Sequence, residues 1–137
     1  MPKKSEITTE TQKPKAHSLE SRQILARMSV KLFGRWRLSL EDQLTLLGLS
    51  QGGRATLRSY ARGKPIGDRQ DRIERAELLL AIHAALGRLY PQNMEIKYNW
   101  VLCKNERFEG KTPLEVMLEG VEGIKRVLSY LNWYCNI

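Results

Sequence analysis

The amino-acid sequence predicts an all-α fold. Apolar residues recur at spacings of three and four in several stretches, which is the period of one face of a helix. No stretch alternates apolar and polar residues for long enough to predict a half-buried strand. Capping residues and glycines mark where the helical stretches begin and end. At 137 residues, the chain is long enough to bury a core without a metal ion or a disulfide.

The first helix is expected to begin at Ser18, whose hydroxyl can cap it, with Ser21 as the alternative start. Gly34 is expected to end this helix. Its apolar face is predicted to hold Leu19, Ile24, Leu25, Met28, Leu32 and Phe33. The preceding residues 1–17 have almost nothing to bury, so they are predicted to form a disordered basic arm.

The second and third helices are predicted to be short. Ser39 is the expected N-cap of the second helix, and Gly48 is expected to close it. Its buried stripe is predicted to consist of Leu40, Leu44 and Leu47. The third helix is expected over residues 54–62, after a turn that contains Gly52 and Gly53. Its inward-facing side chains are predicted to be Leu57, Tyr60 and Ala61.

Two short helices joined by a glycine-containing turn, with a basic outer face on the second, are typical of a DNA-binding helix-turn-helix. Residues 18–66 hold nine Lys and Arg against three acidic residues, whereas residues 67–137 hold ten of each. A basic excess confined to one half is expected when only that half meets a polyanion. The alternative is a scaffold hairpin on a surface whose charge serves solubility. The predicted DNA-binding residues are Arg54, Thr56, Arg58, Ser59, Arg62 and Lys64.

The second half of the chain is predicted to hold four more helices. Residues 68–90 give the longest periodic stretch, with Asp68 as its expected cap and Pro91 just beyond its end. One side of that helix is predicted to carry Ile73, Ala76, Leu80, His83 or Ala84, and Gly87. A fifth helix is expected near residues 93–103.

The sixth helix has the clearest start in the sequence. Thr112 is its expected N-cap, Pro113 its first residue and Glu115 the partner in a capping box, and Gly120 ends it. The last helix is expected to run from Val121 to about residue 133. Its buried residues are predicted to be Ile124, Val127, Leu128 and Leu131.

The loop over residues 104–111 and the C-terminal tail are candidate binding segments. Gly110 permits a turn that other residues resist, and Phe108 is expected to anchor the loop, so folding alone could account for both residues. Packing explains the polar loop residues less readily, namely Asn105, Arg107 and Lys111. The tail over residues 131–137 is expected to be a flexible terminus that carries Trp and Tyr, residue types that anchor interfaces. The alternative is that this tail packs against the first helix.

Several short motifs occur in an order shared with one protein family. They are Trp36-x-Leu38-Ser39, Leu46-Leu47-Gly48-Leu49-Ser50, Thr56-Leu57, Gly63, Arg75, Leu78-Leu79, Trp100, Asn105 and Phe108-x-Gly110-Lys111-Thr112-Pro113-Leu114. In this order and spacing the chain resembles the Xre/MbcA/ParS antitoxins over about residues 20–134. It departs from the family pattern at Gly52-Gly53 and at Tyr60-Ala61.

The resemblance implies an Xre-like DNA-binding half, residues 18–66, and a small helical toxin-binding domain, residues 67–137. Its implied partners are operator DNA and a toxin of the RES fold that consumes NAD, with assembly as a homodimer or as a hetero-oligomer with the toxin. The resemblance also implies that the antitoxin covers the entrance of the toxin's NAD site and represses its own operon. The expected toxin-binding residues are Trp100, Asn105, Arg107, Phe108, Gly110, Lys111, Thr112, Trp133, Tyr134, Asn136 and Ile137.

The sequence argues against an enzyme and against a cofactor. His17 falls in the expected arm and His83 in the middle of a helix, and no Cys/His pair has metal-ligand spacing. Cys103 and Cys135 are expected to be free thiols in a reducing, cytoplasmic compartment. No apolar run approaches the ~20 residues that cross a bilayer, so no membrane partner is expected. Two further functions stay open: a plain helix-turn-helix transcriptional regulator and a protein adaptor that binds no DNA.

Overall fold

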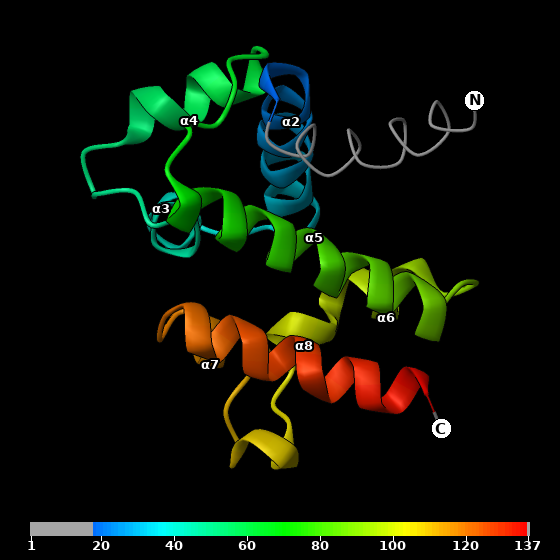
Figure 1. The fold of residues 1–137 in the computed structure, drawn as a ribbon. Helices are drawn as coiled ribbons and strands as arrows, with labels where there is room; N and C mark the ends of the chain where they lie inside the picture. Colours follow the sequence, from blue (N-terminus) through cyan, green and yellow to red (C-terminus); the bar gives the residue numbers. More distant parts are fainter. Residues whose placement is uncertain (1–17, 137) are drawn as a thin grey trace, which may run out of the picture.

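The structure is a computed structural model that describes residues 18–136, and it is all-helical in that part (Figure 1). The predicted arm, residues 1–17, and the last residue, Ile137, lie outside the described residues. Seven α-helices and two short 3₁₀ helices make up the described chain, which has no strand: α2 (Leu19–Arg35), α3 (Leu40–Leu47), α4 (Arg54–Ala61), α5 (Gln70–Leu89), α6 (Met94–Asn99), η1 (Trp100–Leu102), η2 (Glu106–Phe108), α7 (Pro113–Met117) and α8 (Val121–Cys135).

Capping residues set most of the helix starts, as the sequence predicted. The Ser18 hydroxyl accepts a hydrogen bond from the Ser21 N–H at 3.2 Å, and the Ser39 hydroxyl accepts from the Asp42 N–H at 3.1 Å. The capping box of α7 is complete, because Thr112 and Glu115 each accept the other's backbone N–H. The predicted cap of α5 is wrong. Arg69, not Asp68, occupies the N-cap position, and no side chain caps that end.

The buried face of α2 differs from the predicted one. Leu19, Ile24 and Met28 are 58%, 44% and 46% exposed, whereas the buried residues of this helix are Ala26, Ser29, Leu32 and Phe33. A three- or four-residue spacing fits more than one face of a helix. The structure turns the face with two small side chains inward, which lets α2 lie close to α4 and α5. The helix also passes through Gly34 and ends at Arg35, and the chain reverses at Arg37, whose φ is 56°.

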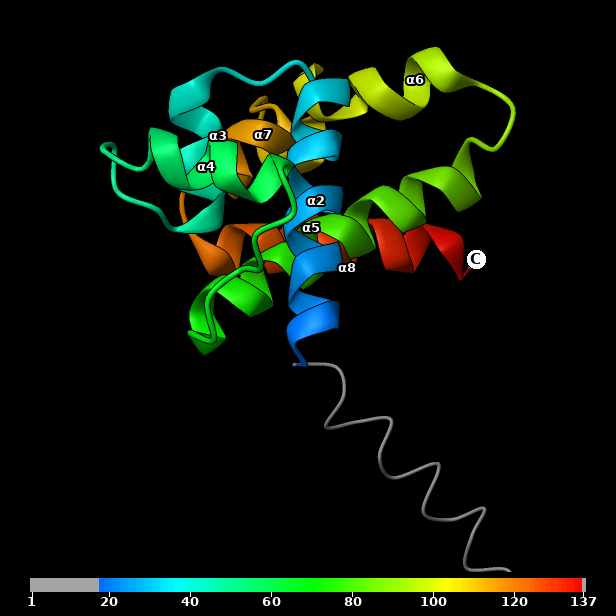
Figure 2. The same cartoon turned by 90° about the horizontal axis from the view of Figure 1, so that it is seen from above.

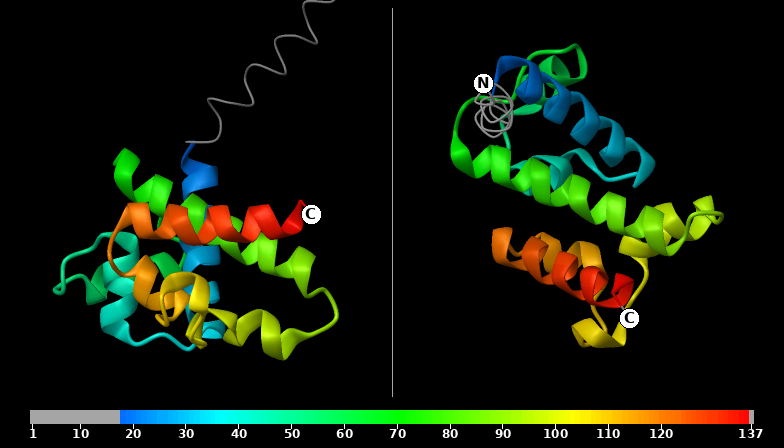
Figure 3. Two further views of the ribbon diagram at one scale, coloured as in Figure 1. Left: turned by 90° about the horizontal axis from the view of Figure 1, so that it is seen from below. Right: turned by 45° about the vertical axis from the view of Figure 1, so that its right-hand side comes forward.

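Helix α5 lies between two groups of helices. In Figures 1 and 3, α2, α3 and α4 lie on one side of it and α7 and α8 on the other. It packs against α2 and α3 and also against α8. Its buried residues are Ile73, Ala76, Leu79, Ile82, Ala85 and Leu86. On the side predicted from the sequence, Ile73 and Ala76 are therefore buried, whereas Leu80, His83 and Gly87 are half-buried and Ala84 is exposed. A helix covered on two sides buries a wider set of positions than a single stripe.

Helices α3 and α4 form the predicted hairpin, joined by residues 48–53. Gly48 has a φ of 74° and ends α3 in the left-handed conformation. At Gly53 a Cβ would lie 3.1 Å from the Ser50 carbonyl oxygen and 3.2 Å from the Leu49 Cβ, so the tight turn favours glycine. Leu57 and Tyr60 are buried as predicted, but Ala61 is exposed. Figure 2 shows α4 and α6 on opposite sides of α2.

Helices α7 and α8 touch at a glycine. Gly123, in the first turn of α8, is buried, and a Cβ built on it would overlap the carbonyl group of Val116. The two helices therefore approach at backbone distance at this point. Helix α8 buries Ile124, Val127 and Leu131, while Leu128 is only half-buried.

One hydrophobic core runs through the described residues and includes buried side chains of every α-helix except α6. Both cysteines are free thiols, Cys103 exposed and Cys135 half-buried. Within residues 18–136 no helix is both long enough and apolar enough to cross a membrane.

Candidate functional site

The outer face of α4 is basic. Arg54, Arg58 and Arg62 recur at four-residue spacing and are exposed, and Leu57 and Tyr60 hold the opposite face in the core. The three guanidinium groups therefore lie along one exposed side of the helix, where phosphates could reach them. Lys64 follows directly after the helix and is also exposed.

The two hydroxyl residues of the predicted DNA site are less available. Thr56 and Ser59 are half-buried, and the Ser59 Oγ donates a hydrogen bond to the Thr56 carbonyl at 2.6 Å. Ser59 still lines a shallow hollow together with Arg62 and Lys64. The structure thus brings three of the predicted residues around one hollow, while Arg54 lies at the far end of α4.

Helix α2 adds cations that the sequence analysis missed. A second hollow, between α2 and α4, is lined by Arg27 and Lys31 of α2 and by Ala61 of α4. The available signal was the four-residue spacing of Arg27 and Lys31 on the polar side of a predicted helix. No acidic side chain lines either hollow. We call this set the basic surface: Arg27, Lys31, Arg54, Arg58, Arg62 and Lys64.

Two hydrogen bonds join α2 to the segment that follows α4. The Arg22 Nη1 donates to the Ile66 carbonyl at 2.8 Å, and the Ile66 N–H donates to the Arg22 carbonyl at 3.1 Å. Ile66 is fully buried just after α4. The segment that carries Lys64 is therefore anchored to α2.

Aromatic side chains gather around Tyr130 in the second half of the chain. The Tyr130 ring stacks on Trp100, with centroids 6.2 Å apart and planes at 13°. Phe108 and Tyr134 meet the same ring edge-on at 5.4 and 5.2 Å. Burial raises the pKa of Tyr130, and a hydrogen bond with Tyr134 raises it further. The structure thus joins three predicted toxin-binding residues, from three separate segments, through a tyrosine that the sequence analysis did not single out.

An exposed patch continues from this cluster. Trp133 is 51% exposed and Tyr134 41% exposed, and their rings meet edge-on at 5.3 Å. The Arg107 guanidinium lies 5.6 Å from the Trp133 ring centroid and 5.8 Å from that of Tyr130. We call Arg107, Trp133 and Tyr134 the aromatic patch. Each of its three side chains contacts at least one of the other two.

The predicted flexible tail is helical. Helix α8 continues to Cys135, beyond the predicted end at Trp133, so the two aromatic residues lie in its last turn. The Cys135 Sγ reaches the Ala85 carbonyl at 3.8 Å and ties this turn to α5. The rings of Trp133 and Tyr134 contact each other, Tyr134 also meets the Tyr130 ring, and Arg107 lies over the Trp133 ring. Asn136 caps the helix end and is exposed.

Five of the predicted toxin-binding residues have structural roles. The Asn105 side chain accepts from the Arg107 N–H at 2.9 Å, and Gly110 has a φ of 84° in the turn that follows. The Lys111 Nζ pairs with Glu119 at 2.9 Å, and Thr112 caps α7. Asn105 and Lys111 therefore do have folding partners, contrary to expectation. Phe108 is 3% exposed and anchors the loop, as predicted.

Residues 18–136 contain no group of three or more His, Cys, Asp or Glu side chains that could hold a metal ion. No family model matches the sequence. The chain is similar to the uncharacterized protein y4oB of Sinorhizobium fredii (strain NBRC 101917 / NGR234). The two are 33% identical over 129 residues, which cover 90% of this chain and 95% of y4oB. The chain belongs to the y4oB family. The match spans nearly all of both chains, so it includes parts of both halves of this chain.

Proposed function

We propose that this member of the y4oB family is the antitoxin of a type II toxin–antitoxin pair. In this proposal residues 18–66 form an Xre-like DNA-binding half and residues 67–137 a small helical toxin-binding domain. The chain acts in the cytoplasm, neutralises a RES-type toxin that consumes NAD, and represses its own operon. The observation that carries the proposal is the aromatic patch, because exposed Trp, Tyr and Arg side chains held together mark a protein-binding surface.

The chemistry of the patch suits a concave partner. Trp133 and Tyr134 project from the end of α8, and the ring contacts with Tyr130 and Arg107 limit their motion before binding. Ordering these side chains on binding therefore costs little conformational entropy. A nucleotide-binding cleft is concave and partly apolar, so a protruding aromatic pair can fill it.

The basic surface supports the second activity. Its cations come from α2, from α4 and from the residues that follow α4, and no carboxylate lines the two hollows. Such a surface attracts the phosphate backbone of duplex DNA, and the Arg side chains of α4 can also reach base edges.

Co-expression with the toxin encoded beside the gene tests the first activity. Arg107→Ala combined with Trp133→Ala should abolish co-purification of the toxin and restore its toxicity to growing cells. The matched control is Leu19→Ala with Lys104→Ala, which also removes one exposed apolar and one exposed cationic side chain, both outside the patch. The proposal fails if the patch variant, present at equal levels with unchanged thermal stability, protects cells as well as the control does.

A gel shift with the promoter DNA of the chain's own operon tests the second activity. Replacing Arg54, Arg58 and Arg62 together by Glu should abolish the shift. The control replaces three exposed cations outside the basic surface by Glu, namely Arg69, Arg88 and Lys104, and so changes the net charge equally. Equal loss of binding in both triple variants would mean that charge alone, and not α4, binds the DNA.

One observation favours a second candidate, an adaptor that binds protein but not DNA. The connection between α3 and α4 spans residues 48–53, which is longer than the three or four residues of a typical helix-turn-helix. An adaptor of this kind would lose the toxin through the patch variant and show no specific gel shift from the start.

A further inference from the structure

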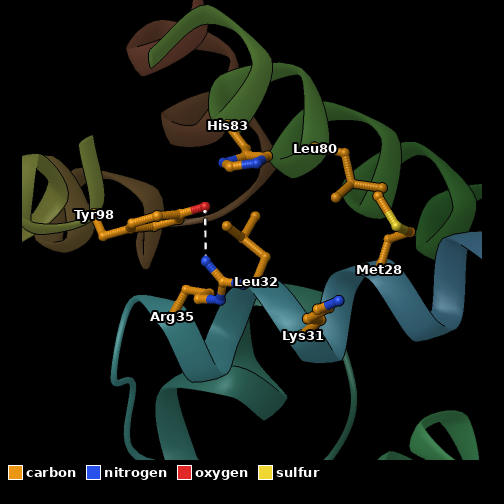
Figure 4. A pocket seen from close by; sticks show the side chains of 7 residues that line it. All are labelled: Met28, Lys31, Leu32, Arg35, Leu80, His83 and Tyr98. Atoms are coloured by element: carbon orange, nitrogen blue, oxygen red, sulfur yellow. Dashed lines mark hydrogen bonds between the residues drawn. The ribbon is translucent and has the colours of Figure 1, made fainter. Parts of the chain in front are cut away.

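A cavity of about 200 Å³ opens between α2, α5 and α6 (Figure 4). It includes no residue of the aromatic patch and shares one residue, Lys31, with the basic surface. Its apolar part comes from Met28 and Leu32 of α2 and from Leu80 of α5. The His83 ring of α5 and the Tyr98 ring of α6 form an aromatic wall, with centroids 5.7 Å apart and planes at 22°. This lining suits a flat apolar body.

The remaining lining residues are cations. Lys31 and Arg35 stand one turn apart on α2 and both line the cavity, and no Asp or Glu lines it. Neither cation forms an ion pair with any described residue. A third cation, Lys97, lies 5.4 Å from the Tyr98 ring centroid. Burial lowers the pKa of His83, and the charges of Lys97 and Arg35 lower it further, which indicates a positive potential along this wall.

The polar groups are already positioned. The Arg35 Nη1 donates to the Tyr98 hydroxyl at 3.2 Å, and its guanidinium carbon lies 5.2 Å from the Tyr98 ring centroid (Figure 4). Arg35 is thereby held in the cavity lining, and its other guanidinium N–H groups make no hydrogen bond to a described residue. The buried Nδ1 of His83 has no hydrogen-bond partner among the described residues. Arg35, with its fixed guanidinium, and His83, with its unpartnered Nδ1, thus both line the cavity. The other lining residues are apolar side chains, Tyr98 and the cation Lys31.

We propose that this cavity is a binding site for a small monocarboxylate with a flat apolar body. The carboxylate pairs with Lys31 and Arg35, and the apolar body lies over Leu32 and Leu80 beside the His83 ring. The volume is below the about 300–1,000 Å³ of sites for drug-sized ligands, so it suits a ligand of one ring. A bare phosphate would leave the apolar floor unmatched, and an uncharged ring would leave the two cations unpaired. This inference does not depend on the proposed function.

Calorimetric titration of the full-length chain with benzoate tests the site, with benzyl alcohol, acetate and inorganic phosphate as comparison probes. Benzoate should bind at least about tenfold more tightly than any of these, because each of them lacks either the charge or the apolar body. Acetate and phosphate binding as tightly as benzoate would show a simple anion site and would overturn the proposal.

Two variants locate the binding. Lys31→Gln should weaken benzoate about tenfold, since it removes one charge-assisted hydrogen bond. Leu80→Trp should abolish binding by filling the cavity. The control is Arg88→Gln, an exposed cation of α5 that does not line the cavity, and it should leave the affinity unchanged. Lys31 is exposed and makes no hydrogen bond to another described residue, so the Lys31→Gln variant should fold. Equal affinity of Lys31→Gln and wild-type protein, or no benzoate binding to the wild-type protein, would overturn the assignment.

Discussion

Position 123 in α8 has no room for a side chain, so it requires glycine. A methyl group at this position would meet the backbone of Val116, which cannot move aside as a flexible side chain could. Gly123→Ala should therefore lower the free energy of unfolding by about 3 kcal/mol, at the upper end of the usual cost of overpacking. Urea unfolding followed by circular dichroism measures the loss.

The control for this prediction is Gly87→Ala in α5. There the new methyl group would meet only the end of the Lys97 side chain, at 3.8 Å, and the residue is helical. This substitution should raise the free energy of unfolding by about 0.5–1 kcal/mol, because alanine favours the helix over glycine. Unchanged or increased stability of Gly123→Ala would contradict the close approach of α7 and α8.

His83 makes stability depend on pH in a predictable direction. Burial, together with the nearby Lys97 and Arg35 charges, lowers its pKa in the folded chain below the ordinary value of 6.5. The unfolded chain then binds more protons than the folded chain as the pH falls through about 6.5. The free energy of unfolding should therefore drop between pH 7.5 and 5.5, and His83→Gln should reduce that drop. Urea midpoints measured across this range test the prediction, and parallel pH profiles for the two proteins would contradict it.

At the scale of the elements, the sequence predicted the helix starts better than the buried helix faces. Ser18, Ser39 and Thr112 were correctly predicted as caps, because an N-cap acts only on the first turn of its own helix. The buried faces of α2 and α5 were predicted wrongly in part, because the rotation of a helix about its axis depends on what it packs against. Tyr130 gave no separate signal, since a mid-helix aromatic residue resembles an ordinary core residue. Three of the four aromatic residues of the cluster were therefore predictable, and the central one, Tyr130, was not.

If the basic surface binds DNA as proposed, the DNA affinity of the chain should fall steeply as the salt concentration rises. The proposed basic surface would neutralise several phosphates, and each phosphate neutralised adds about 0.9 to the slope of log affinity against log salt concentration. Arg58→Gln should lower that slope by about one, because Arg58 is exposed at the middle of the α4 face. Fluorescence anisotropy with labelled operator DNA at 50–200 mM salt measures both slopes. An unchanged slope with weaker affinity would mean that Arg58 reaches a base edge and not a phosphate.

For the whole molecule, the position of α5 predicts cooperative unfolding. Ile82 is fully buried in the helix that packs against α2 and α3 and also against α8. Ile82→Ala should cost about 2–5 kcal/mol and should accelerate amide hydrogen exchange in α3 and in α8 alike. Mass spectrometry of peptides from both helices detects this. Met94→Ala, which removes an exposed side chain on α6, should leave both exchange rates unchanged. Faster exchange in only one of the two helices would show two independently opening units.

The shared use of α5 also restricts how members of this family can exchange parts by recombination. A crossover near residue 66 would join α2, α3 and α4 of one parent to an α5 selected to pack against the other parent's helices. A crossover after residue 89 would create the same mismatch between α5 and α8. Hybrids between this chain and y4oB should therefore fold well only where the residues of α5 that face the exchanged helices match those of the parent that supplies them. New combinations of the two surfaces in this family would then arise more readily by substitution of exposed residues than by exchange of halves.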